Sequence, residues 1–139
     1  MNWLSWSLLA ALFAGATAIL AKVGVSGVDS NLATAVRTTV VLVFAWAVVP
    51  LTGPFSAVLA LSKRTWLFLA LSGLATGLSW LCYFRALQLG EASKVAPVDK
   101  LSVVFVLVFA AAFLGESLTP KTVLGGALIA AGSIVLALK

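Results

Sequence analysis

The chain has 139 residues, of which 63% are hydrophobic and only 9% are charged. Soluble globular domains are about 45–50% apolar and about 25% charged, so this composition excludes an ordinary soluble domain and indicates a membrane protein. The net charge is +5, but the basic residues are scattered between apolar runs, which argues against a nucleic-acid partner. With one cysteine and no histidine, an internal disulfide, the usual zinc sites and histidine-based catalysis are also excluded.

Five apolar segments are long enough to cross a bilayer, which takes about 20 residues in a helix. In chain order these helices are expected at residues 3–21, 32–51, 66–87, 95–114 and 122–138. The first has no basic residue before its apolar run, so we interpret it as a retained helix rather than a signal peptide. The sequence therefore predicts an all-α membrane protein with one domain over residues 1–139 and its termini on opposite sides of the bilayer.

The connections between these helices are short and carry helix-end signals. Ser30 or Asn31 is expected to cap the second helix. Thr119 and Pro120 suit the N-cap and the first turn of the fifth helix. No connection has room for a soluble domain, so lipid is the environment of most of the chain.

Small residues at helical spacing predict where the helices pack, because lipid tails supply no hydrophobic force between helices. The candidates are Gly73 and Gly77 in the third helix and Gly126 and Ala130 in the fifth. The third helix also carries a stripe of hydroxyl groups on one face: Ser72, Thr76, Ser79 and Tyr83. This stripe either hydrogen-bonds to its own backbone or lines a cavity, and Trp80 beside it either packs or contributes to a site.

The stretch 90–104 carries the densest polar chemistry and enters the fourth helix. Asp99 and Lys100 lie only about 7 Å beyond Val95 at ~1.5 Å per residue, short of the centre of a ~30 Å core. Pro97 is a candidate helix break, and Ser102 shares a face with Asp99. Because charges in lipid cost at least ~2.5–3.5 kcal/mol, Asp99 and Lys100 are candidates for substrate binding, ion coupling or gating, with structural pairing as the alternative.

Two arginines also lie within predicted helices. Arg37 is more than one turn inside the second helix, and Arg85 is near the end of the third. Either residue can anchor its helix at the interface or supply a counter-charge for an acid. Both are therefore kept as candidate site residues beside the interfacial interpretation.

The charge bias across the membrane is weak. The connections on one side carry Lys63, Arg64 and Lys121, and the other side carries Lys22, Lys94 and Lys139. Adding the helix-end residues Arg37, Arg85 and Lys100 to the second side gives three basic residues against six. This difference is only a modest bias toward one orientation. A chain of this kind can insert both ways and pair head-to-tail.

Three stretches resemble the EamA-like domain of the drug/metabolite transporter superfamily. They are 85–97, the Leu-Gly-Glu box within 113–120, and the Gly125 to Gly132 spacing of the last helix. The run from Pro97 to Ser102 is similar to the short, single-repeat bacterial and archaeal branch. The resemblance covers the whole chain as one five-helix repeat, and Arg37 falls where such domains commonly carry an arginine.

Most relatives of this kind hold two inverted repeats, so the resemblance implies a homodimer, and the weak charge bias suggests an antiparallel one. It further implies a transporter of a small metabolite or drug-like solute, working by alternating access in the inner membrane of a prokaryote. No cofactor, metal or catalytic residue is expected, and a membrane enzyme is disfavoured. If protons are coupled, Asp99 is the best available acid and Glu116 the second; a non-transporting scaffold or accessory subunit is the alternative.

Overall fold

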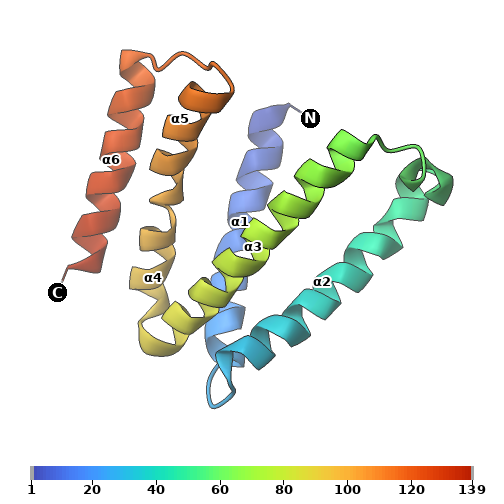
Figure 1. The fold of residues 1–139 in the computed structure, drawn as a ribbon. Helices are drawn as coiled ribbons and strands as arrows, with labels where there is room; N and C mark the ends of the chain where they lie inside the picture. Colours follow the sequence, from blue (N-terminus) through green and yellow to red (C-terminus); the bar gives the residue numbers. More distant parts are fainter. Residues whose placement is uncertain (1, 139) are drawn as a thin grey trace. The chain divides into compact units, whose positions relative to one another are not determined.

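The computed structural model of the chain describes residues 2–138, which contain helices and no β-strand (Figure 1). Its helices are α1 (Trp3–Gly24), α2 (Ser30–Thr52), η1 (Phe55–Val58), α3 (Lys63–Leu89), α4 (Ala92–Asp99), α5 (Ser102–Phe113) and α6 (Pro120–Ala137). Taken with α4 and α5 as one span, five segments are long and apolar enough to cross a membrane. The predicted fold class is therefore confirmed. Lys139, which the charge comparison used, lies outside the described residues.

The chain forms two compact units. The terminal unit is Met1–Lys22 with Leu89–Lys139, and the central unit is Val23–Gln88. In the terminal unit, α4 and α5 lie along α6 (Figure 1). The Nζ of Lys22 donates a hydrogen bond of 2.8 Å to the carbonyl oxygen of Gly90, which ties the end of α1 to the segment before α4. The start of α1 and the end of α6 lie at opposite ends of this unit (Figure 1).

Side-chain caps explain where the helices begin. Oδ1 of Asp29 accepts hydrogen bonds of 3.0 Å from the backbone N–H groups of Asn31 and Leu32. The prediction of Ser30 or Asn31 as the cap was therefore wrong, because one carboxylate one residue earlier satisfies two orphan donors. At α6 the prediction is confirmed, since Oγ1 of Thr119 accepts from the N–H of Thr122 and Pro120 is the first helical residue.

The Leu-Gly-Glu box ends α5. Gly115 has φ +68°, a left-handed conformation that glycine adopts at no steric cost. The turn brings the backbone N–H of Glu116 to 3.2 Å from the carbonyl oxygen of Ala110. The helix therefore stops at Phe113, and the chain reverses direction into α6.

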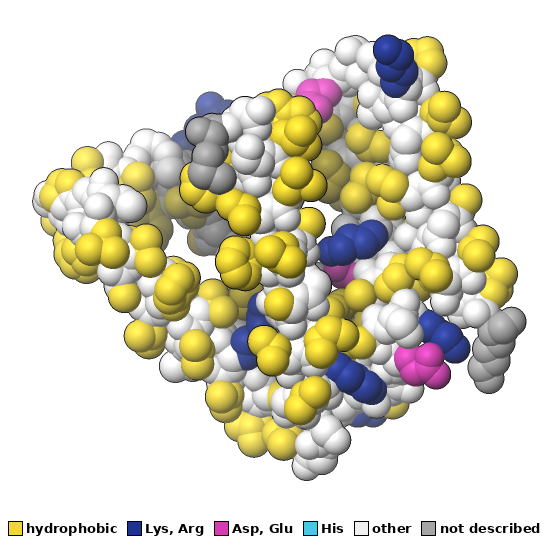
Figure 2. All heavy atoms as spheres, turned by 180° about the vertical axis from the view of Figure 1, so that it is seen from behind, with side chains coloured by type: hydrophobic (Ala, Val, Ile, Leu, Met, Phe, Trp, Pro, Cys, Tyr) yellow, Lys and Arg dark blue, Asp and Glu magenta, His cyan; other side chains and the backbone are white. Residues whose placement is uncertain are grey.

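Hydrophobic side chains are spread over the whole face seen in Figure 2, and charged groups appear on it singly or in small clusters. Long apolar residues of every span are exposed, for example Leu12, Val43, Leu74, Phe105 and Leu128. A soluble monomer rarely leaves such large apolar areas in water. The surface is instead suited to lipid tails, in agreement with the five apolar spans.

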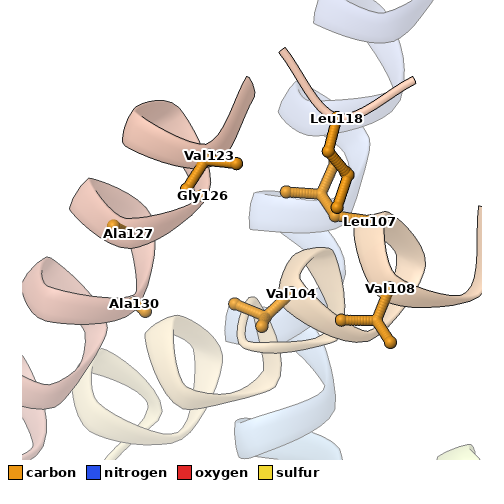
Figure 3. Close-up of a pocket in the computed structure, with 8 residues that line it drawn as sticks. All are labelled: Val104, Leu107, Val108, Leu118, Val123, Gly126, Ala127 and Ala130. Carbon is orange, nitrogen blue, oxygen red and sulfur yellow. The ribbon is translucent and has the colours of Figure 1, made fainter. Parts of the chain in front are cut away.

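An open apolar pocket of ≈ 280 Å³ lies between α5 and α6 of the terminal unit (Figure 3). It is lined by Val104, Leu107 and Val108 of α5, by Leu118 of the connection, and by Val123, Gly126, Ala127 and Ala130 of α6. Gly126 makes the close approach, since a Cβ there would lie 2.6 Å from Cδ1 of Leu107. At Gly73 and Gly77, by contrast, no described atom lies within 4 Å of an added Cβ.

This contact predicts that Gly126→Val destabilises the protein by roughly 1 kcal/mol, the low end of the cost of overpacking, because Cδ1 of Leu107 is the end of a flexible side chain and can shift. Gly125→Val is the matched control, because it changes helix propensity equally but has no atom within 4 Å of its Cβ. Adding Leu107→Ala to Gly126→Val should restore part of the loss. Thermal unfolding in detergent, followed by circular dichroism, measures all three; equal losses for the two glycine variants would contradict the packing.

Candidate functional site

The fourth span changes helix type part-way along its length. The predicted helix 95–114, with its candidate break at Pro97, is divided into α4 and α5 by Lys100 and Leu101. Pro97 lies inside α4, three residues before the interruption. Its ring nitrogen has no proton and cannot donate to the carbonyl group of Ser93, which weakens the helix there.

The junction between α4 and α5 keeps its backbone hydrogen bonds. Lys100 N–H donates to Pro97 at 3.0 Å and Leu101 N–H donates to Val98 at 3.0 Å. Val103 and Val104 then bond to Lys100 and Leu101 in the same way. These are i→i−3 bonds, so the chain passes through a tightened 3-10 turn rather than an unwound loop. A 3-10 stretch inside a helix is a common form of hinge.

The junction lies deeper in the span than the sequence predicts. Because α4 begins at Ala92 rather than at Val95, Asp99 lies about 10 Å along the span at ~1.5 Å per residue. The whole span, Ala92–Phe113, has 22 residues and is therefore about 33 Å long. Asp99 and Lys100 consequently lie near one third of the way through, where polar groups are costly in lipid.

At the junction, Nζ of Lys100 lies 3.5 Å from Oδ2 of Asp99. The two side chains, although neighbours in sequence, therefore form an ion pair. Their exposed fractions are 56% for Lys100 and 39% for Asp99, so both remain accessible within the isolated chain. Ser102, the first residue of α5, is also exposed. An exposed pair of this kind stabilises a protein by only about 0–1 kcal/mol, which leaves both groups able to exchange partners.

A second cluster lies in the central unit and joins α2 to α3. The Cζ of Arg37 lies 4.2 Å from the ring centroid of Trp80 and 5.6 Å from that of Phe84. Trp80 and Phe84 are four residues apart, so they share one face of α3. Tyr83 interacts electrostatically with Arg37 as well. The structure thus brings together Arg37, Trp80 and Tyr83, which the sequence analysis named, and adds Phe84, whose i+4 spacing from Trp80 was the available signal.

The remaining candidates are not part of this cluster. Nη1 of Arg85 donates to Oε1 of Gln88 at 2.8 Å, and the Gln88 amide donates to the carbonyl oxygen of Val28. Arg85 therefore helps to fix the end of α3 against the loop before α2. In the hydroxyl stripe, Thr76 donates to the carbonyl oxygen of Ser72 at 2.9 Å, while Ser79 is exposed. Part of the stripe thus follows the backbone-bonding interpretation.

Comparison with known proteins identifies the family of this arrangement. The model of the EamA-like transporter family matches residues 1–138. The chain belongs to the EamA-like transporter family. An uncharacterized transporter in the cobO 3′ region of a Sinorhizobium species is 54% identical over 136 residues, which are 98% of this chain and 96% of that protein. No solved structure matches the chain.

Membership of the EamA-like family confirms the predicted resemblance. Together with the five apolar spans, it makes the protein a multi-pass membrane protein of a transporter family rather than of an enzyme family. The near-complete coverage of its relative also means that the single-repeat length is shared by that protein. The two side-chain clusters can now be considered as parts of a small transporter.

The junction predicts an effect of Pro97→Ala on stability. The alanine supplies an N–H for the carbonyl oxygen of Ser93, so the variant should be more stable by about 1–3 kcal/mol. Pro120→Ala is the matched control, because Pro120 is the first residue of α6, where the missing N–H has no cost. Thermal unfolding midpoints in detergent compare the two variants. The same change in both would show that Pro97 does not weaken the fourth span.

Proposed function

We propose that the protein is a small secondary transporter of a small metabolite or drug-like solute, acting by alternating access as a homodimer. The observation that carries the proposal is the 3-10 junction with the Asp99–Lys100 ion pair, inside a span of an EamA-like protein. Interrupted helices near the bilayer midplane are where transporters commonly bind substrate and coupling ions. A bacterial relative named as a transporter and an apolar surface support a prokaryotic inner-membrane location.

The size of the chain supports a homodimer. Transporters of this architecture place their substrate between two repeats, and one chain supplies a single repeat of five spans. Pairing two copies would complete the cavity and would bring two junctions to it. Because an odd number of spans puts the termini on opposite sides, an antiparallel pair gives the inverted symmetry that alternating access uses.

Asp99 is the proposed coupling group at the junction. Its carboxylate can release Lys100 and accept a proton or a cationic substrate group, and the 3-10 turn can flex as the partner changes. Glu116 is the second candidate acid, and it lies in the connection after α5. Proton coupling would therefore depend more strongly on Asp99 than on Glu116.

This proposal predicts that Asp99→Asn lowers transport at least tenfold while the protein stays folded, because the exposed ion pair contributes only about 0–1 kcal/mol to stability. Purified protein in vesicles is challenged with amino acids, sugars and quaternary ammonium drugs. A trapped pH-sensitive dye reports proton movement, and labelled solute reports uptake.

Glu91→Gln is the matched control, since Glu91 forms a similar pair with Lys94 at 3.7 Å but precedes α4. Leu124→Ala at an exposed apolar position controls for a lost side chain. Unchanged transport by Asp99→Asn would contradict the coupling role. Absence of transport by the parent protein across the whole panel would favour a scaffold or accessory subunit.

The antiparallel dimer predicts that each terminus labels from both sides of the membrane. Cys82 is exposed, so it is first replaced by alanine. A single cysteine is then placed beside either terminus, and intact cells are treated with a membrane-impermeant maleimide. About half of the molecules should react for each variant. Labelling of all molecules at one terminus and none at the other would establish a single orientation.

A further inference from the structure

We propose that Arg37, held against Trp80 and Phe84, is a binding site for an oxyanion, namely a carboxylate or a phosphate group. The site lies in the central unit, between α2 and α3, and is separate from the Asp99–Lys100 junction in the sequence. The guanidinium carbon lies 4.2 Å from the Trp80 centroid and 5.6 Å from the Phe84 centroid. These contacts orient the cation without neutralising it.

The charge of Arg37 is not balanced within its unit. Asp29 is the one acid of the sequence between residues 23 and 88. Its carboxylate already accepts two backbone N–H groups at the start of α2. No hydrogen bond or ion pair found among residues 2–138 includes Arg37, although a guanidinium carries five N–H donors. The donors are therefore available to an acceptor from outside the unit.

Because Arg37 lies deep within a membrane helix, an acceptor from outside the unit would stabilise its charge. Arg37 follows Ser30, the first residue of α2, by seven positions, or about 10 Å along a helix. A charged group within a membrane helix carries a large desolvation cost. A cation–π contact returns less than this cost, so the aromatic rings offset only part of it. An oxyanion would offset the remainder.

The chemistry of Arg37 favours an oxyanion over other acceptors. Its guanidinium carbon lies over the Trp80 ring, and the paired N–H donors of a guanidinium match a carboxylate or phosphate with two parallel N–H···O bonds. One turn earlier on α2, the Thr34 hydroxyl donates to the carbonyl oxygen of Ser30 at 2.7 Å. The neighbours one turn later, Val40 and Val41, are apolar. The site therefore suits an anionic group attached to an apolar body.

Two sources could supply this group, a solute or the headgroup of an anionic lipid. The solute source rests on the proposed transport function and would make the substrate a small organic anion. The lipid source does not depend on transport. Binding is measured without transport, so a parent protein that binds the anion but transports no solute would contradict the transport function and not this site.

The experiment measures thermal unfolding of the full chain in lipid nanodiscs. In phosphatidylcholine, benzoate and phenyl phosphate are added as probes, with benzamide as the neutral control. In a second series phosphatidylglycerol is included and no solute is added. A ligand that binds the folded state raises the unfolding temperature in proportion to its occupancy. The expected rise occurs with benzoate, phenyl phosphate or phosphatidylglycerol, and not with benzamide.

Arg37→Gln should weaken binding of the effective anion at least tenfold. Arg64→Gln is the matched control, since the Cζ of Arg64 also lies near an aromatic ring, 5.8 Å from the Phe68 centroid, and this change should leave binding unchanged. Arg37→Lys keeps the charge and should weaken binding at least threefold, because an ammonium group cannot form the bidentate contact. Arg37→Lys also tests the proposal if Arg37→Gln fails to fold.

A rise with a soluble probe assigns the site to a solute, and a rise with phosphatidylglycerol alone assigns it to lipid. Either result supports the proposal when it depends on Arg37. The proposal is overturned if no anion raises the unfolding temperature in either series. Equal binding by the parent protein and by Arg37→Gln, or by Arg37→Lys, would overturn it as well.

Discussion

A chain inside a bilayer has to satisfy its backbone polar groups from within, because lipid offers no hydrogen bonds. The fourth span meets this constraint in an unusual way. Pro97 removes one donor, and the chain responds with i→i−3 bonds around Lys100 and Leu101 instead of opening into a loop. The span can therefore bend while remaining in the membrane. The same turn presents Asp99 and Lys100, so the hinge and the charges are one feature.

The scarcity of acids shapes the rest of the molecule. The sequence has only four acidic residues against nine basic ones, and each acid has a definite place. Asp29 caps α2, Glu91 pairs with Lys94, Asp99 pairs with Lys100, and Glu116 follows the turn at Gly115. Arg37 is left to contact aromatic rings instead of a carboxylate. Among the described residues, one cluster therefore holds both charges and a second holds only a cation.

Much of the fold could be predicted because its signals are local. Span number follows from runs of apolar residues, and Gly115, Thr119 and Pro120 mark helix ends by backbone chemistry alone. The errors came from competition between nearby groups. Asp29 takes the cap expected of Ser30 or Asn31, and the start of α4 at Ala92 moves Asp99 deeper than predicted. Pro97 indicated a weak point, but the interruption falls three residues later.

The sequence alone determined the membrane class, the five spans, the family resemblance and the residues able to carry charge at depth. Each depends on composition or spacing along a single helix. Only the tertiary structure decided that Arg37 meets Trp80 and Phe84, and that Gly126 approaches Leu107 while Gly73 and Gly77 have no such neighbour. These contacts depend on the rotation and separation of two helices. That relation arises from packing many side chains at once, and no single segment encodes it.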